Sequence, residues 1–182
     1  GFAEYQKNEA WTWEHQALVR ARCVVGDAAL SDKVGQIRRQ VLSSRQQETD
    51  LAGKVRDMRT KMRGKLDKST DQLFDLKQGI GAITDIEFMV QYAVLAWSAN
   101  LPELLVYTDN IRILDALVTT GKLDKAEGDI LAEAYRVYRS EANHCVLQER
   151  PALVPRAQVG DYPQQVASIW QRWLGESLNS PD

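Results

Sequence analysis

The residues whose types and spacing could support chemistry lie together between Phe74 and Tyr92. A short apolar run carries Lys77, and glycines follow at Gly79 and Gly81. Loops that approach a phosphate or another backbone closely need glycine, and a helix N-terminus beside a lysine attracts an anion. Lys77, Gly79 and Gly81 are therefore candidates for contact with a nucleotide or with another protein domain.

The same segment has a purely structural explanation. Thr84 and Glu87 have the spacing of a capping box, in which the hydroxyl and the carboxylate satisfy free N–H groups at a helix start. Gly81 is followed by Ala82, which cannot adopt positive φ cheaply, so a very close backbone approach is not expected at that position. Both explanations stay open: a cap that fixes the angle of the helix, and contact with an anion or a neighbouring domain.

Helical spacing of apolar residues predicts helices along most of the chain. We predict an all-α fold, an irregular bundle of about seven helices, forming a single domain over residues 1–182. The helix from 85 to 99 is the most hydrophobic and is expected at the centre. The expected helices cover residues 2–24, 29–42, 50–66, 85–99, 109–120 and 125–148, and a last one opens at Asp161.

The first predicted helix carries two arginines, Arg20 and Arg22, in a tryptophan-rich context. Its expected buried stripe includes Trp13 and Val24. Two arginines at this spacing point to different faces of a helix, where they form surface salt bridges or reach a triphosphate or another domain. The aromatic context favours a helix that is covered by something.

Composition restricts the class of protein. The chain has 182 residues, 44% hydrophobic and 26% charged, with a net charge of −2, so a nucleic-acid-binding surface is not expected. No apolar run is long enough to span a bilayer. Cys23 and Cys145 have no metal-binding spacing and are expected to be reduced, buried thiols in a cytoplasmic protein. Because the chain starts with Gly1 and Phe2, we expect a piece of a longer protein.

A basic stretch runs from Lys54 to Lys68, and its role stays open. The ordinary interpretation is a solvated helix face, and the alternative is a surface that meets an acidic partner. Its members are Lys54, Arg56, Arg59, Lys61, Arg63, Lys65 and Lys68.

Three separated segments, 8–22, 74–92 and 107–114, together resemble a known family. In this order they are similar to bacterial glutamate-ammonia-ligase adenylyltransferase, over about residues 2–173. The resemblance is to the helical portion that follows the adenylylating nucleotidyltransferase core, and it implies that the core itself lies outside this chain. It further implies an enzyme that uses ATP and Mg²⁺ to attach AMP to a tyrosine of glutamine synthetase and also removes it, under control by glutamine and the PII protein.

The catalytic carboxylates of that superfamily follow a Gly-Ser turn as Asp-x-Asp, which the chain lacks. Asp85 and Glu87 point about 200° apart on a helix and do not suit a shared metal. We therefore expect no catalytic residue, no metal site and no tightly bound cofactor. Instead, Arg20, Arg22, Lys77, Gly79 and Gly81 would contact the nucleotide or the core.

Two alternatives remain. A PII uridylyltransferase has a similar Lys-x-Gly-x-Gly-Gly-x-x-Asp-Ile run, although the Trp-Thr-Trp-Glu-His-Gln segment favours the adenylyltransferase. A stand-alone helical interaction module would bind an acidic protein through its basic face. A segment separated from its core is expected to leave an uncovered patch near residues 79–83, whereas a complete module is not.

Overall fold

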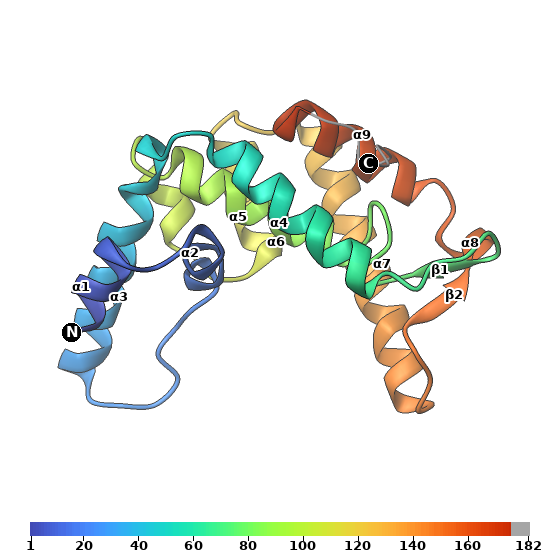
Figure 1. Ribbon diagram of the computed structural model, residues 1–182, viewed down its shortest axis with the longest axis horizontal. Helices are drawn as coiled ribbons and strands as arrows, with labels where there is room; N and C mark the ends of the chain where they lie inside the picture. The colour runs from blue at the N-terminus through green and yellow to red at the C-terminus, as the bar shows by residue number, and fades with distance from the viewer. Residues whose placement is uncertain (176–182) are drawn as a thin grey trace. The chain divides into compact units, whose positions relative to one another are not determined.

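The computed structural model describes residues 1–175, apart from the side chain of Gln46, and these residues are mainly helical (Figure 1). The prediction of an all-α chain is confirmed. The chain divides into two compact units: unit 1 comprises residues 1–55 and 90–122, and unit 2 comprises residues 56–89 and the chain from Leu123 onward. This division into compact units does not test the prediction that residues 1–182 form a single domain, which stays a prediction.

The described residues contain nine α-helices, where about seven were predicted. The first predicted helix is in fact two helices, and a short extra helix lies near the C-terminal end. None of the helices in residues 1–175 combines the length and the apolar character needed to cross a membrane. Two helices, α4 (Leu51–Leu66) and α5 (Ile83–Trp97), each contribute residues to both units.

Unit 1 is built around α3, against which α1 and α2 pack. Asp27 begins α3 by accepting hydrogen bonds from two backbone N–H groups, and Asp109 begins α6 by accepting one from the Arg112 N–H group. Besides parts of α4 and α5, the unit contains α1 (Phe2–Asn8), α2 (Thr12–Val19), α3 (Ala28–Ser43), η1 (Arg45–Gln47), η2 (Pro102–Leu105) and α6 (Asn110–Thr119).

A buried arginine joins separate segments of unit 1. Arg38 of α3 donates hydrogen bonds to the carbonyl oxygens of Leu18 and Val19 at the end of α2, and to those of Leu105 and Tyr107. Carbonyls at a helix C-terminus lack intrahelical donors and carry partial negative charge, so a guanidinium suits them. Burial nevertheless lowers the pKa of Arg38.

Unit 2 contains a small sheet, beside α8 (Figure 1). Strands β1 (Leu73–Asp75) and β2 (Leu153–Pro155) are antiparallel, with Phe74 opposite Val154. Strand β1 overlaps the apolar run that carries Lys77, and β2 lies between the predicted helix 125–148 and the last predicted helix. The remaining elements are α7 (Lys125–Leu147), α8 (Arg156–Val159) and α9 (Tyr162–Leu174).

Helix α7 presents a buried stripe to the core of unit 2, at positions with helical spacing, beside the half-buried Tyr135. Leu131, Tyr138, Ala142 and Cys145 are all buried, and the Tyr138 ring lies 5.7 Å from that of Phe74 on β1. Helix α9 packs against α7. Residues 85–99 were expected to form the most hydrophobic helix, at the centre, and α5 is buried on most of its faces.

Candidate functional site

The loop between β1 and α5 contains Gly79 and Gly81 and is held by Asp75. The Asp75 carboxylate accepts hydrogen bonds from the backbone N–H groups of Lys77 and Gln78, both at 2.9 Å, and of Lys68 at 3.2 Å. The Asp75 carbonyl accepts another from the Gly79 N–H at 2.9 Å. One buried residue therefore fixes the first half of the glycine loop.

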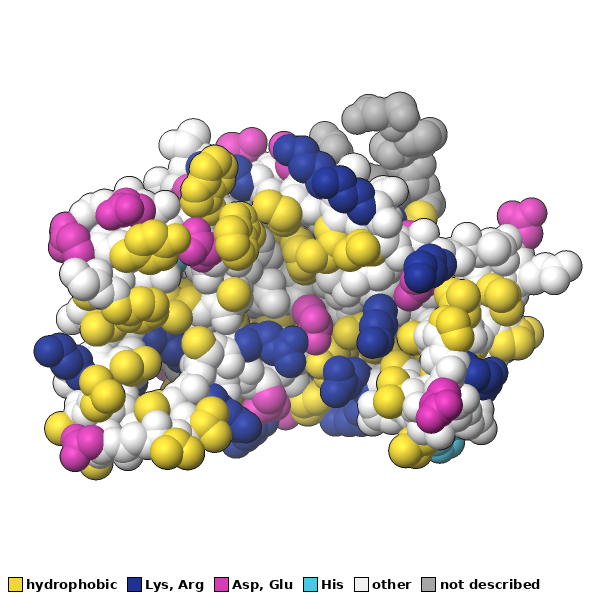
Figure 2. All heavy atoms as spheres, turned by 60° about the horizontal axis from the view of Figure 1, so that its bottom comes forward, with side chains coloured by type: hydrophobic (Ala, Val, Ile, Leu, Met, Phe, Trp, Pro, Cys, Tyr) yellow, Lys and Arg dark blue, Asp and Glu magenta, His cyan; other side chains and the backbone are white. Residues whose placement is uncertain are grey.

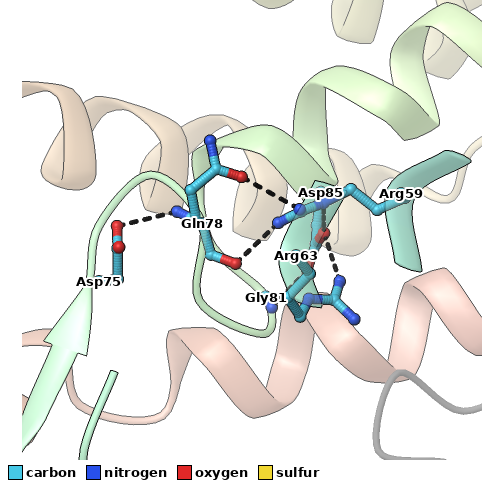
Figure 3. A network of polar contacts seen from close by, with 6 residues as sticks. All are labelled: Arg59, Arg63, Asp75, Gln78, Gly81 and Asp85. Carbon is cyan, nitrogen blue, oxygen red and sulfur yellow. Dashed lines mark hydrogen bonds and ion pairs between the residues drawn. The ribbon is translucent and has the colours of Figure 1, made fainter. Parts of the chain in front are cut away.

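The second half of the loop is held by a buried charge cluster (Figure 3). Asp85 Oδ1 accepts from Arg59 Nε at 2.5 Å and from Arg63 Nη2 at 2.8 Å, and its Oδ2 accepts from the Gly81 N–H at 2.6 Å. Arg59 also donates to the side-chain oxygen and the carbonyl oxygen of Gln78. The cluster joins α4, the loop and the first turn of α5.

The electrostatics of this cluster are those of a buried ion pair. The side chains of Arg59 and Asp85 are both 0% exposed. Burial lowers the pKa of Arg59, and the negative charge of Asp85 opposes that effect. Removing either partner would leave an uncompensated buried charge, so the conformation of the loop depends on both Arg59 and Asp85.

The predicted caps, Thr84 and Glu87, occupy other roles. Helix α5 begins at Ile83, so Thr84 lies inside its first turn, and its N–H donates to the Lys77 carbonyl. Glu87 Oε1 accepts a hydrogen bond from Tyr135 Oη of α7 at 3.1 Å. The carboxylate that reaches back to the loop is that of Asp85.

The two glycines are required by the packing of unit 2 itself. A Cβ atom on Gly79 would lie 2.8 Å from the Asp75 carbonyl oxygen, and one on Gly81 would lie 2.1 Å from the Pro163 carbonyl oxygen of α9. Gly81 also has a φ of +76°, a conformation that favours glycine. The expectation of an uncovered patch at residues 79–83 is wrong, because four of these five residues are buried and Ile80 is half-buried.

The cationic candidates are distributed over both units. Lys77 follows β1 in unit 2 and has an exposed side chain, whereas Arg20 and Arg22 are exposed residues of unit 1 just after α2. The structure brings Lys77, Gly79 and Gly81 together in one loop. It also adds Arg59, Arg63, Asp75 and Asp85, which were not among the residues predicted to contact a nucleotide or a catalytic core.

The basic stretch separates by residue type. Arg56, Arg59 and Arg63 lie at i, i+3 and i+7 and turn inward, and Arg56 donates to the Leu174 carbonyl at 2.6 Å. The side chains of Lys54, Lys61, Lys65 and Lys68 are exposed. The interpretation as one solvated face holds only for the lysines. Arginine is better suited than lysine to buried ion pairs. The spacing of the three arginines was therefore the feature of the sequence that indicated an inward-facing set.

A cavity of about 470 Å³ lies beside the loop in unit 2. Its lining includes Ile80 of the loop, Arg156 of α8 and Gln164 of α9, together with Asp67 and Ser69. Within residues 1–175 no group of three or more His, Cys, Asp or Glu side chains is placed to hold a metal. Asp75 and Asp85 already accept N–H groups, so the loop does not fit a Mg²⁺ site and supplies no free carboxylate for acid–base chemistry.

Comparison with known proteins divides the chain between two family models. Residues 1–37 match glutamate-ammonia ligase adenylyltransferase, and residues 49–149, more than half of the chain, match GlnD PII-uridylyltransferase. A bifunctional glutamine synthetase adenylyltransferase/adenylyl-removing enzyme from Nitrosococcus oceani is 48% identical over 169 residues, which cover 93% of this chain and 17% of that relative. The chain thus belongs to the family of the PII-uridylyltransferase model, its first 37 residues are similar to the glutamate-ammonia ligase adenylyltransferase model, and it spans about a sixth of the length of the Nitrosococcus enzyme.

Proposed function

We propose that this chain is a helical segment of a bifunctional glutamine synthetase adenylyltransferase/adenylyl-removing enzyme. The longer enzyme would use ATP and Mg²⁺ in the cytoplasm to attach AMP to a tyrosine of glutamine synthetase, and would also remove it, thereby regulating nitrogen assimilation. The observation that carries this proposal is the 48% identity over 93% of the chain.

The segment would support catalysis rather than perform it. The carboxylates of the glycine loop are engaged by N–H groups and guanidinium groups, so Mg²⁺ and the reacting phosphate would be held by residues outside the described chain. The loop would therefore contribute only to binding or orienting the nucleotide or the catalytic core. Nothing in this role requires a cofactor bound tightly to the segment itself.

The exposed cations are the residues proposed to meet the nucleotide or the catalytic core. Lys77 lies two residues after Asp75, whose carboxylate accepts a hydrogen bond from the Lys77 N–H, so the backbone that carries its ammonium group is fixed. Gly79 and Gly81 would hold the loop that presents it, and Arg20 and Arg22 would make a second contact from unit 1. Glutamine synthetase and the PII protein would be the macromolecular partners.

The test compares the 182-residue chain with the longer polypeptide that carries it. Incubated with ATP, Mg²⁺ and glutamine synthetase, the longer polypeptide is expected to transfer labelled AMP, and the 182-residue chain is expected to transfer none. Transfer by the 182-residue chain would contradict the supporting role. In the longer polypeptide, Lys77→Ala should raise the KM for ATP or lower kcat, whereas Lys61→Ala, a control on the exposed face of α4, should change neither.

A second candidate, a PII uridylyltransferase, is favoured by the family match over residues 49–149. The same assay with UTP and the PII protein distinguishes the two. Labelled UMP on PII without labelled AMP on glutamine synthetase would replace the first proposal by the second.

A further inference from the structure

Helices α1 and α2 of unit 1 reverse the usual distribution of polar and aromatic side chains. Three polar side chains face inward: Gln6, His15 and Gln16 are 6%, 1% and 3% exposed. Four aromatic side chains lie outside: Phe2, Tyr5, Trp11 and Trp13 are 48%, 40%, 70% and 50% exposed. Sequence periodicity placed Trp13 and Val24 in a buried stripe, and this prediction is wrong, because Val24 is 81% exposed.

The buried side of α1 and α2 is joined by hydrogen bonds. His15 Nε2 lies 2.9 Å from the Gln6 carbonyl oxygen, and Gln16 Nε2 donates to Gln91 Oε1 of α5 at 3.1 Å. Within the described chain, Gln6 Oε1 and His15 Nδ1 have no hydrogen-bond partner. A stable protein ordinarily buries large aromatic side chains in preference to such groups, so the outward aromatic face calls for an explanation.

The outward face is held in a defined arrangement. Glu14 accepts a hydrogen bond from Tyr5 Oη at 2.6 Å and another from the Trp11 N–H at 2.9 Å, which joins the two helices on their outer side. Charged residues such as Lys7 and Glu9 are exposed on the same segment. Figure 2 shows one face of the molecule, on which hydrophobic side chains reach the surface at many points between charged ones.

We infer that the aromatic surface formed by Phe2, Tyr5, Trp11 and Trp13 is a docking surface for polypeptide of the same longer chain, from outside residues 1–182. This inference rests on the proposed function. Tyrosine and tryptophan with a polar rim are typical of protein interfaces, and exposed apolar patches mark them. Exposed tyrosine and tryptophan beside charged residues fit a polypeptide as the occupant.

Two observations favour the same longer chain over another protein. The matched region covers only 17% of the Nitrosococcus relative, so most of such a polypeptide lies outside the segment and is tethered to it at high effective concentration. The aromatic surface also falls within residues 1–37, which match the adenylyltransferase model, and outside residues 49–149, which match the other model. The surface therefore lies in the part of the chain that is similar to the adenylyltransferase model.

The test is photo-crosslinking in the longer polypeptide, with Trp11→p-benzoylphenylalanine and, as a second variant, Trp13→p-benzoylphenylalanine. After illumination and digestion, mass spectrometry is expected to find position 11 or 13 joined to peptides from outside residues 1–182 within a monomer. The matched control is Leu147→p-benzoylphenylalanine, because Leu147 at the end of α7 is also exposed, at 81%. Its yield of such adducts should be several-fold lower.

Three results would overturn the inference: adducts confined to residues 1–182, adducts that join two copies, or adducts that form only with glutamine synthetase. AMP transfer by the unsubstituted longer polypeptide is measured in parallel. If the proposed function is wrong, the longer polypeptide will transfer no AMP although the intramolecular adducts form. If the docking surface is wrong, the polypeptide will transfer AMP but the intramolecular adducts will not form.

Discussion

The glycine loop of unit 2 and the α1–α2 segment of unit 1 both bury polar side chains, but they do so in opposite ways. In the loop, each oxygen of the Asp85 carboxylate has a donor, and the space beside Gly81 is filled by Pro163. In α1–α2, Gln6 and His15 bury atoms that have no hydrogen-bond partner among the described residues, while tryptophans lie outside. The loop is thus complete within the chain, and the α1–α2 segment has the character of half an interface.

The largest effect is expected from removing the charge of Asp85. Asp85→Asn leaves the fully buried Arg59 without its anion, so the free energy of unfolding measured with urea should fall by about 3–5 kcal/mol. The control is Asp129→Asn, which removes an exposed pair with Lys125 and should cost less than about 1 kcal/mol. Equal losses from the two variants would show that the Arg59–Asp85 pair contributes no more than a surface pair.

The second-largest effect is expected from Gly81→Ala. A Cβ atom there would collide with the Pro163 carbonyl oxygen and would also sit at φ +76°, so unfolding free energy should fall by about 2–4 kcal/mol. Gly121→Ala is the matched control, because Gly121 has φ +70° but nothing within 4 Å of the added atom. Its loss should be about 1 kcal/mol, and a Gly81 loss no larger would mean that α9 yields to the methyl group.

Acidification should affect the α1–α2 segment through His15. Burial lowers the pKa of His15, so the unfolded chain, with a histidine pKa of about 6.5, binds a proton before the folded one does. Stability that is present above about pH 6.5 should therefore decrease as the pH falls below that value, which thermal melting between about pH 7.5 and 5.5 can measure. His15→Gln should flatten this decrease, whereas replacing the exposed His144 by Gln should preserve it.

The smallest effect is expected from the outward tryptophans. In the 182-residue chain, Trp11→Gln should change the free energy of unfolding by less than about 0.5 kcal/mol, because 70% of that side chain is already in water. Trp170→Ala, in the core of unit 2 at 1% exposure, should cost about 3–5 kcal/mol in the same urea titration. A large loss from Trp11→Gln would mean that the aromatic surface already stabilises the segment by itself.

Features set by neighbouring residues could be predicted from the sequence. The buried stripe of α7 follows from helical spacing, and Asp109 caps α6 because a carboxylate at that position satisfies nearby N–H groups. The glycines of the loop were identified from the sequence. The packing that requires glycine at position 81 was not, because Pro163 lies far along the chain. The Arg59–Asp85 pair joins residues 26 positions apart, and counting charges cannot reveal it.

The α1–α2 segment could not be predicted for a different reason. Periodicity assumes that aromatic residues turn toward the core of their own domain. Trp11 and Trp13 violate that assumption, and the break between α1 and α2 removes the single helix on which the stripe was drawn. The sequence did indicate that this helix is covered by something, and the proposed docking surface gives that expectation a location.

The interleaving of the two units has a consequence for synthesis on the ribosome. Unit 1 needs residues 90–122 as well as 1–55, and unit 2 needs the chain after Leu123 as well as 56–89. A nascent chain that has just released α5 already holds Arg59, Gly81 and Asp85, but Pro163 is still untranslated. The charge cluster can therefore form during translation well before its covering helix exists. A chain truncated before α9 would keep the hydrogen bonds that hold the glycine loop, but the side of the loop that α9 covers would be exposed.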